Sequence, residues 1–387
     1  MTTVATANSS GTLNVSAAGT ITGTAAEIIA AFADGTVTEA SDVALTVNSG
    51  TATLAQARSL DGLTTGVVTA TIADTVVSDL LGSSPLLDAN GNNAFTITIG
   101  TDDATVAAAD LNTLDGLTTV AINAGNVTTI TSSSLADINT LYASSGFSGL
   151  GDQAITANDT GSIAASTITT VATANSSGTL NVSAAGTITG TAAEIIAAFA
   201  DGTVTEASDV ALTVNSGTAT LAQARSLDGL TTGVVTATIA DTVVSDLLGS
   251  SPLLDANGNN AFTITIGTAD AEITAANLTS LNGLTTVAID ATNVTQITGT
   301  VAAANTVYTA GDNSEISGLG NETVVISGES SNTLSDASTL NTLDGNTTGT
   351  VNAGSLTTIQ GALSDVLTAY ASNGITGLGN EAITLTD

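Results

Sequence analysis

The sequence predicts an elongated parallel α/β solenoid of about seven units, each running strand, helix, strand, short helix. Three observations carry this prediction. The box at residues 60–65 (LDGLTT) returns in altered forms along the chain, residues 2–101 recur letter for letter as residues 169–268, and strand-like and helix-like patterns alternate. A half-unit of roughly 25–30 residues is the length of a βα solenoid coil. The alternative is a β-helix or a string of small β-rich domains, which the capped Ala-rich stretches disfavour.

Recurrence of the box sets the domain boundaries. Its glycines are Gly62, Gly116, Gly229, Gly283 and Gly345, and degenerate boxes end at Gly11 and Gly178. Successive glycines lie 51, 54, 62, 51, 54 and 62 residues apart, which makes a super-repeat of 167 residues. We expect super-repeats at 1–167 and 168–334, each with units of about 51, 54 and 62 residues, and a partial third at 335–387. One continuous solenoid would run through all three.

Two residues of the box have predicted local roles. At Gly62 and the other box glycines we expect a turn with positive φ, because glycine lacks the Cβ that penalises this conformation. The box aspartates are expected to accept hydrogen bonds from the backbone of their own turn; they are Asp61, Asp115, Asp228 and Asp344. Asn282 replaces the acid in one box, which keeps that role and argues against an obligatory metal ligand.

The first unit shows two strand patterns and two helical ones. Thr24 and Glu27 form a capping box, in which each side chain satisfies the other's free backbone donor, and Asp34-Gly35 ends the helix that follows. The predicted elements are strand 12–16, helix 25–33, strand 43–47 and helix 54–60.

The next two units repeat this plan. Their predicted elements are strand 66–71, helix 74–81, strand 95–99, helix 107–114, strand 120–123, helix 135–143 and strand 153–156. The motif Gly-Leu-Gly at 149–151 precedes the last of these strands. It recurs at 318–320 and 377–379, ahead of strands predicted at 322–327 and 381–386.

An aromatic residue stands near the end of the longer helix in five places. This regularity indicates packing in the core and not ligand binding. The five residues are Phe32, Tyr142, Phe199, Tyr308 and Tyr370.

The charge balance excludes several partners. The chain has two Lys or Arg residues and 35 Asp or Glu residues, for a formal net charge of −33. Nucleic acid and anionic membranes require cationic side chains, so neither is expected to bind. No apolar run approaches the ~20 residues of a membrane span, and residues 1–30 do not resemble a signal peptide. The acids indicate solubility and mutual repulsion, with a role in holding divalent cations as the alternative.

The chain lacks most of the side chains that enzymes commonly use for catalysis. There is no His or Cys, and the only basic residues are Arg58 and Arg225. Catalytic triads, Schiff bases, and zinc, haem and iron–sulfur sites therefore lose their usual groups. We expect no enzymatic activity and no small-molecule substrate.

Calcium is the one cofactor that the sequence suggests. The loop at 88–93 (DANGNN) and its copy at 255–260 place oxygen ligands as the first positions of an EF-hand loop do. The weak candidate ligands are Asp88, Asn90, Asn92, Asp255, Asn257 and Asn259. The glycine is misplaced, however, and Ile99 stands where a bidentate Glu is needed, so a polar turn is favoured.

Two phrases near the end of the chain resemble a known family. Residues 340–353 (LNTLDGNTTGTVNA) and 370–381 (YASNGITGLGNE) are similar to the repeats of giant secreted cell-surface proteins of marine cyanobacteria, some of which are associated with swimming motility. The resemblance implies an extracellular, acidic, non-enzymatic repeat protein, with the calcium dependence and type I export common among such proteins.

Two functions follow as hypotheses. The first is a structural spacer in a large surface or filament-forming protein, with its ends meeting neighbouring repeats or further copies of the chain. The second is an adhesive module that binds calcium, glycan or ice through a repeated face, for which Thr-x-Thr pairs such as Thr96 and Thr98 are candidates. Because Met1 stands where the second copy has Ile168, we expect the chain to be an excerpt of a longer array, with its export signal elsewhere.

Overall fold

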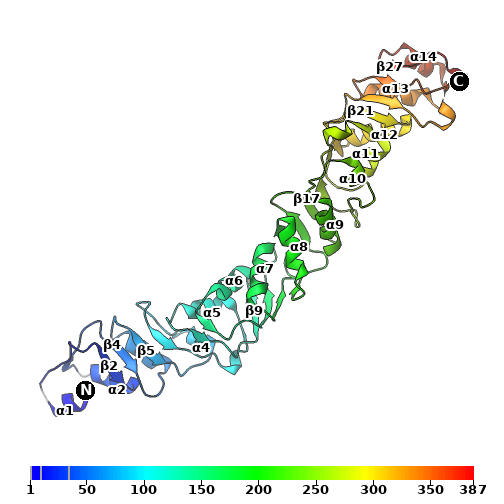
Figure 1. Ribbon diagram of the computed structural model, residues 1–387. Coiled ribbons are helices and arrows are strands. Elements are labelled where there is room, and N and C mark those ends of the chain that lie inside the picture. Colours follow the sequence, from blue (N-terminus) through cyan, green and yellow to red (C-terminus); the bar gives the residue numbers. More distant parts are fainter. Residues whose placement is uncertain (1, 9–10, 34) are drawn as a thin grey trace. The chain divides into compact units, whose positions relative to one another are not determined.

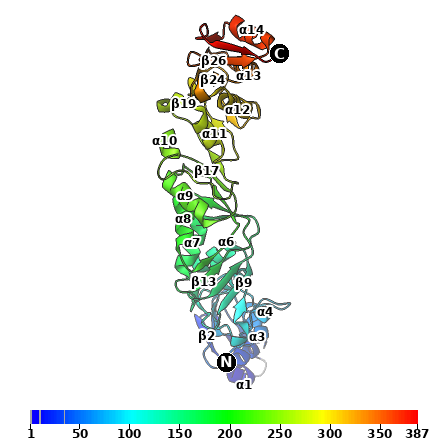
Figure 2. The same cartoon turned by 90° about the vertical axis from the view of Figure 1, so that its right-hand side faces the viewer.

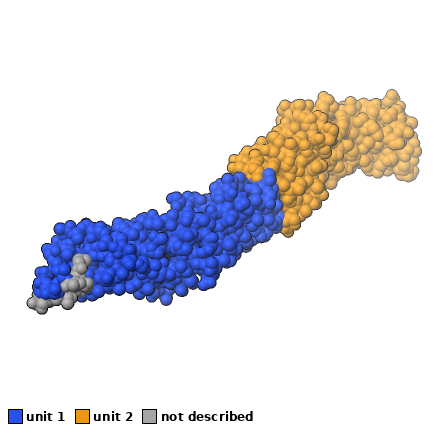
Figure 3. Space-filling view, turned by 60° about the horizontal axis from the view of Figure 1, so that its bottom comes forward, with its two compact units in different colours: residues 1–185, 198–207 blue, residues 186–197, 208–387 orange. Residues whose placement is uncertain are grey.

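The protein is an α/β structure, seen in a computed structural model that describes residues 2–8, 11–33 and 35–387. Its contacts group into two compact units, coloured separately in Figure 3: residues 1–185 with 198–207 (unit 1), and residues 186–197 with 208–387 (unit 2). Met1 and Asp34, to which the sequence assigned a repeat boundary and a helix end, lie outside the described residues.

Short helices and shorter strands alternate along unit 1. Its helices are α1 (Thr2–Ala7), α2 (Ala25–Ala33), α3 (Leu54–Asp61), α4 (Val77–Leu80), α5 (Ala108–Asp115), α6 (Leu135–Ala143) and α7 (Ala165–Ala174). Its strands are β1 (Leu13–Asn14), β2 (Thr20–Gly23), β3 (Val37–Thr38), β4 (Ala44–Val47), β5 (Val68–Thr71), β6 (Ala94–Thr96), β7 (Thr105–Val106), β8 (Ile122–Asn123), β9 (Thr129–Ser133), β10 (Phe147–Ser148), β11 (Ala154–Ala157), β12 (Ser162–Ala164), β13 (Thr179–Asn181) and β15 (Val204–Thr205).

Unit 2 has the same alternation, and α8 (Ala192–Ala200) contributes residues to both units. Its other helices are α9 (Leu221–Leu230), α10 (Val244–Leu247), α11 (Ala275–Asn282), α12 (Val301–Asp312), α13 (Ala337–Asn346) and α14 (Leu363–Ala371). Its strands are β14 (Thr187–Gly190), β16 (Ala211–Val214), β17 (Val235–Thr238), β18 (Ala261–Thr263), β19 (Glu272–Thr274), β20 (Ile289–Asp290), β21 (Gln296–Gly299), β22 (Ile316–Ser317), β23 (Thr323–Ile326), β24 (Thr333–Leu334), β25 (Val351–Asn352), β26 (Thr358–Gly361), β27 (Ile375–Thr376) and β28 (Ala382–Leu385).

The strands of unit 1 pair in parallel. Its two larger sheets run β2-β4-β5-β6 and β7-β9-β11-β13-β15, beside the pairs β1-β3 and β8-β10. Paired residues lie 23 to 25 positions apart, as in Ile21 with Leu45 and Leu45 with Val68. Each strand therefore pairs with a strand one turn of chain later, and we call such a turn a coil. Helices α5, α6 and α7 lie side by side, next to β9 and β13 (Figures 1 and 2).

Unit 2 is built in the same way. It contains the parallel runs β14-β16-β17-β18, β19-β21-β23-β25-β27, β20-β22 and β24-β26-β28, with paired residues 23 to 27 positions apart. Helices α11 to α14 pack in succession. The predicted α/β class with parallel strands is confirmed; the number of units and their continuity remain predictions.

The core of each unit consists of small and branched aliphatic side chains between strands and helices. Period-two alternation buries Leu45 of β4, and the inward face of α3 buries Ala57 and Leu60. The largest fully buried side chains are Phe95 and Phe262, which lie in strands. Within the described chain no helix is long and apolar enough to cross a membrane.

Most predicted elements are present with shifted ends. The helices predicted at 25–33 and 135–143 match α2 and α6. The helix predicted at 74–81 shortens to α4, because Asp74 Oδ1 accepts the Val76 N–H (3.0 Å) and forms a turn first. Helix α7 was missed, since its threonines favour strands. Within α7 their hydroxyls bond to carbonyl oxygens one turn back, as Thr170 Oγ1 does to Ser166 O (2.8 Å).

The prediction of positive φ at Gly62 is wrong. Gly62 has φ −72° and ψ −12°, and Gly116 and Gly283 are similar, so the helical conformation continues through the glycine. Gly229 and Gly345 lie inside α9 and α13. The chain leaves the helix through a threonine instead, because Thr64 Oγ1 accepts the N–H of Gly66 (2.9 Å).

Candidate functional site

The leucine of each box is the core residue of its helix. All five side chains have no exposed surface: Leu60, Leu114, Leu227, Leu281 and Leu343. Burying a leucine contributes about 2 kcal/mol of hydrophobic free energy. The buried leucine thus anchors the box in the core. It also fixes the position of the polar residues of the box relative to the rest of the coil.

The box aspartate bonds to the next coil. Asp61 is 5% exposed, and its Oδ1 accepts the side-chain amide of Asn93 (2.7 Å) and the backbone N–H of Ala89 (3.3 Å). The copy repeats this, with Asn260 and Ala256 donating to Asp228 (2.7 and 3.3 Å). Asn93 in turn accepts the N–H of Val68 on its Oδ1 (3.0 Å), so the carboxylate and strand β5 are joined through one fully buried amide.

In the other boxes, the residue at the aspartate position also bonds to the next coil, but to a different side chain. Ser144 Oγ donates to Asp115 Oδ2 (2.7 Å), and Ser372 Oγ donates to Asp344 Oδ2 (2.6 Å). Asn282 donates through Nδ2 to Glu315 Oε2 (2.9 Å). The predicted role of capping the local turn is therefore wrong, because these partners lie 28 to 33 residues downstream.

The two threonines that end each box bond to the preceding coil. Thr64 Oγ1 donates to the carbonyl oxygen of Val43 (2.6 Å), and Thr65 Oγ1 donates to that of Ser41 (3.1 Å). The first threonine of the other boxes makes the same bond; these are Thr118, Thr231, Thr285 and Thr347. The stretch from leucine to second threonine, which we call the clamp, therefore ties three successive coils together.

A second set of acids caps helices of the preceding coil, and sequence reasoning missed it. Asp103 Oδ2 accepts the N–H of Val77 (2.6 Å), and Asp159 Oδ2 accepts the N–H of Leu135 (2.7 Å). Asp270 and Glu329 do the same for α10 and α12. A helix N-terminus has unpaired N–H groups and a positive dipole end, which a carboxylate stabilises. The signal that could have revealed these acids is their spacing, 24 to 28 residues after the helix start.

The three tyrosines use their hydroxyls as well as their rings. Tyr142 donates to Gln153 Oε1 (2.9 Å), Tyr308 donates to Glu322 Oε2 (2.9 Å), and Tyr370 bonds to Glu381. Gln153 and Glu322 follow Gly-Leu-Gly and are fully buried. Burial raises the pKa of Tyr142 and of Tyr308. For Tyr370, burial and the Glu381 carboxylate raise the pKa to about 12.

The five aromatic residues, which were predicted to pack in the core, differ in how deeply their side chains are buried. Tyr308 is buried, whereas Phe32, Phe199 and Tyr142 are half-buried. Tyr370 is 38% exposed.

In the candidate calcium loops, the aspartate side chain accepts hydrogen bonds from backbone N–H groups of its own loop. Asp88 accepts the N–H of Asn92 on Oδ1 and the N–H of Asn93 on Oδ2, both at 3.0 Å. Asp255 repeats this with Asn259 and Asn260 (3.1 Å each). The remaining candidates do not converge on the acid: Asn90 and Asn92 donate to carbonyl oxygens of Thr64 and Thr65, and Asn257 is exposed. Among the described residues, no group of three Asp or Glu side chains is arranged to hold a metal ion.

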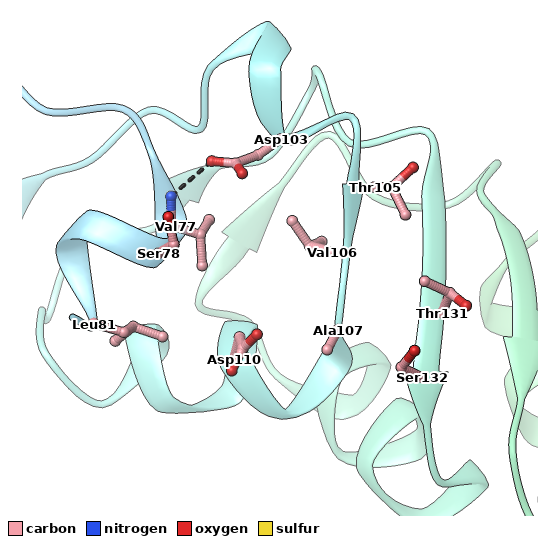
Figure 4. Close-up of a pocket in the computed structure, with 10 residues that line it drawn as sticks. All are labelled: Val77, Ser78, Leu81, Asp103, Thr105, Val106, Ala107, Asp110, Thr131 and Ser132. Carbon is pink, nitrogen blue, oxygen red and sulfur yellow. Dashed lines mark hydrogen bonds between the residues drawn. The ribbon is translucent and has the colours of Figure 1, made fainter.

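An open groove in unit 1 lies between α4, α5 and strands β7 and β9. It encloses about 420 Å³ and contains two carboxylates, Asp103 and Asp110, beside Ser78 and Thr131 (Figure 4). The Asp103 carboxylate points toward α4 and accepts the Val77 N–H, as the dashed line shows. The other lining residues are small or aliphatic: Val77, Leu81, Thr105, Val106, Ala107 and Ser132. The groove therefore has a mixed lining, with more apolar than polar surface.

No protein-family model and no curated protein sequence matches this chain. The arrangement of its own residues is therefore what supports a function.

Proposed function

We propose that this chain is a non-enzymatic structural segment, an elongated parallel α/β solenoid of about seven units that acts as a spacer in a large extracellular surface or filament-forming protein. The observation that carries the proposal is the clamp. Its leucine is buried, its acid or amide bonds to the following coil, and its threonines bond to the preceding coil. Side chains that could form a site are used between coils instead.

The surface chemistry supports the same role. A net charge of −33 with two basic residues keeps such segments soluble and apart. The extracellular location rests on the resemblance of residues 340–353 and 370–381 to repeats of secreted cell-surface proteins.

Insertion of a third copy of residues 168–334 after residue 334 tests the spacer. A solenoid that gains some seven coils should lengthen by about 30 Å, since neighbouring strands lie about 4.8 Å apart. Small-angle X-ray scattering should then show a longer maximum dimension and an unchanged cross-section. A particle that swells in all directions would sink the proposal, because it would mean that the copies fold into a globule or into separate bodies.

A further inference from the structure

The groove between α4, α5, β7 and β9 contains a carboxylate that bonds to nothing in unit 1. Asp110 lies in the first turn of α5 and is exposed, and within the described chain its oxygens make no hydrogen bond. Asp103, the other acid of the groove, instead caps α4, as Asp159 caps α6. The role of Asp110 is therefore not explained by contacts between coils.

The floor of this groove is apolar. Val77 of α4 and Val106 of β7 are 4% and 8% exposed. The partly exposed Leu81 and Ala107 extend this surface to either side of Asp110, as Figure 4 shows. At about 420 Å³ the groove is large enough for a small ligand. An aliphatic chain of several methylene groups can therefore lie along it.

Hydroxyl groups border the groove on the side of β9. A bulge in β9 inserts one residue more than the paired segment of β11 has, and Ser132 is exposed at this bulge with φ 53°. The hydroxyls of Thr131 and Ser132 line the groove and make no hydrogen bond within the described chain. A hydroxyl oxygen accepts hydrogen bonds, so this side provides acceptors beside the free carboxylate.

These groups complement a cation at the end of an aliphatic stem. A neutral aliphatic ligand would leave Asp110 unpaired, and an anion would be repelled by Asp110 and by the net charge of −33. Among protein side chains, lysine has the matching form: a flexible four-carbon stem and an ammonium group with three donors. The sequence contains no lysine, so neither this chain nor a second copy of it supplies the ligand.

We infer that the groove of unit 1 binds a lysine side chain of a partner protein. The methylene groups of the lysine lie along the apolar floor, and its ammonium group donates to Asp110, with the hydroxyls of Thr131 and Ser132 as further acceptors. This inference goes beyond the proposed spacer, to which it adds a point of attachment. It does not depend on the number of units, because all residues of the groove lie in unit 1.

The second copy of the repeat differs at this place. Asn277 stands on α11 where Asp110 stands on α5, and β21 pairs with β23 without a bulge. The chain therefore tolerates an amide at this position of the helix. The variant Asp110→Asn should fold normally, which makes it a suitable probe of the ligand contact.

Nuclear magnetic resonance of the full chain tests the inference, with the methyl signals of Val77 and Leu81 as reporters. The probe is lysine with its α-amino and carboxyl groups capped as amides, and we expect saturable shifts with a Kd of about 1 mM. The same probe acetylated at Nζ keeps the stem and loses the charge, so it should bind at least about fivefold more weakly. A capped diaminopropionic acid keeps the charge on a stem of one methylene, and it should also lose at least about fivefold.

Two variants separate a specific contact from general attraction to an acidic chain. Asp110→Asn should weaken binding of the capped lysine at least about fivefold. Asp79→Asn, the matched control, removes an exposed carboxylate of α4 that does not line the groove, and it should change the Kd less than about twofold. Shifts that do not saturate, equal binding of the acetylated probe, or equal losses in the two variants would overturn the inference.

Discussion

At the residue scale, the polar side chains of this protein act over one coil. Asp61, Asp103 and Thr64 all bond to backbone or amide groups 21 to 32 residues away. Bonds of this kind hold neighbouring coils in register, because a slip by one residue would break every one of them. Three predictions follow at this scale.

The bond between Asp61 and Asn93 should be worth about 1–3 kcal/mol, since Asp61→Ala leaves a fully buried amide without its acceptor. Urea unfolding should show this loss in the free energy of unfolding. Asp42→Ala, which removes an exposed carboxylate, is the matched control and should change stability by less than about 0.5 kcal/mol. Equal losses in the two variants would mean that net charge, and not the buried bond, matters.

Calcium should leave the melting temperature unchanged beyond the effect of an equal ionic strength of magnesium. Both oxygens of Asp88 are already occupied by the N–H groups of Asn92 and Asn93. The variant Asp88→Asn should destabilise the chain equally with and without calcium, by about 1 kcal/mol. A calcium-specific rise of several degrees that Asp88→Asn abolishes would instead favour the adhesive, ion-dependent hypothesis.

The hydroxyl of Tyr370 should make the protein sensitive to alkali. Its pKa is raised from 10.0 to about 12, so the folded state favours the protonated form. The stabilisation is fully present below pH 10 and is lost as the pH rises through about 12. Absorbance of tyrosinate should show no transition near pH 10 in the folded protein, and Tyr370→Phe should be less sensitive to alkali. A normal titration near pH 10 would contradict the bond to Glu381.

At the scale of the element, the helices are short and depend on their ends. Thr24 and Glu27 form the predicted capping box, with Thr24 N–H donating to Glu27 Oε2 (2.9 Å) and Glu27 N–H donating to Thr24 Oγ1 (3.2 Å). The backbone N–H and hydroxyl of Thr24 lower the pKa of Glu27. Isolated helices of nine residues are unstable, so caps and packing on the neighbouring coil must hold α2 in place.

Gly62 of the box and Gly66, which directly follows the box, should respond oppositely to alanine. Gly62 is helical with φ −72° and its nearest added-Cβ neighbour is 3.5 Å away, so Gly62→Ala should stabilise by about 0.4–1 kcal/mol. At Gly66 a Cβ would overlap the carbonyl oxygen of Asp42 on the preceding coil. Gly66→Ala should therefore destabilise by at least about 2 kcal/mol. Thermal unfolding of the two variants measures the difference, and a loss at Gly62 would contradict the helical assignment.

At the scale of the whole molecule, the chain combines an aliphatic core in each unit with a strongly acidic composition. Packing within each unit is repeated from coil to coil, so stability is expected to be approximately a sum over neighbouring coils. The net charge of −33 opposes this compact state through self-repulsion.

Raising sodium chloride from 10 to 150 mM should therefore increase the melting temperature, because the Debye length falls from about 30 to about 8 Å. Only two basic residues are available for ion pairs that salt would weaken. Differential scanning calorimetry measures the shift, and equal additions of sucrose control for osmotic effects. A melting temperature that falls with salt would show that attraction between charges outweighs repulsion.

The sequence by itself determined the repeat, the alternation of strands and helices, and the residue types that the chain lacks. These are local or compositional properties: the capping box at Thr24 needs only four residues, and folding cannot supply the His, Cys and Lys side chains that the chain lacks. It also located the box, through recurrence alone. It misjudged Gly62 and Asp61, because a glycine and an aspartate after a helix usually form the local turn.

Only the tertiary structure decided what the box does. The partner of Asp61 is an amide 32 residues later, and the acid that caps α4 is 26 residues after Val77. Which residues meet across coils depends on the register of parallel strands, where a shift of one residue turns each side chain to the opposite face. That register is set by packing of the whole coil, so no window of neighbouring residues contains it.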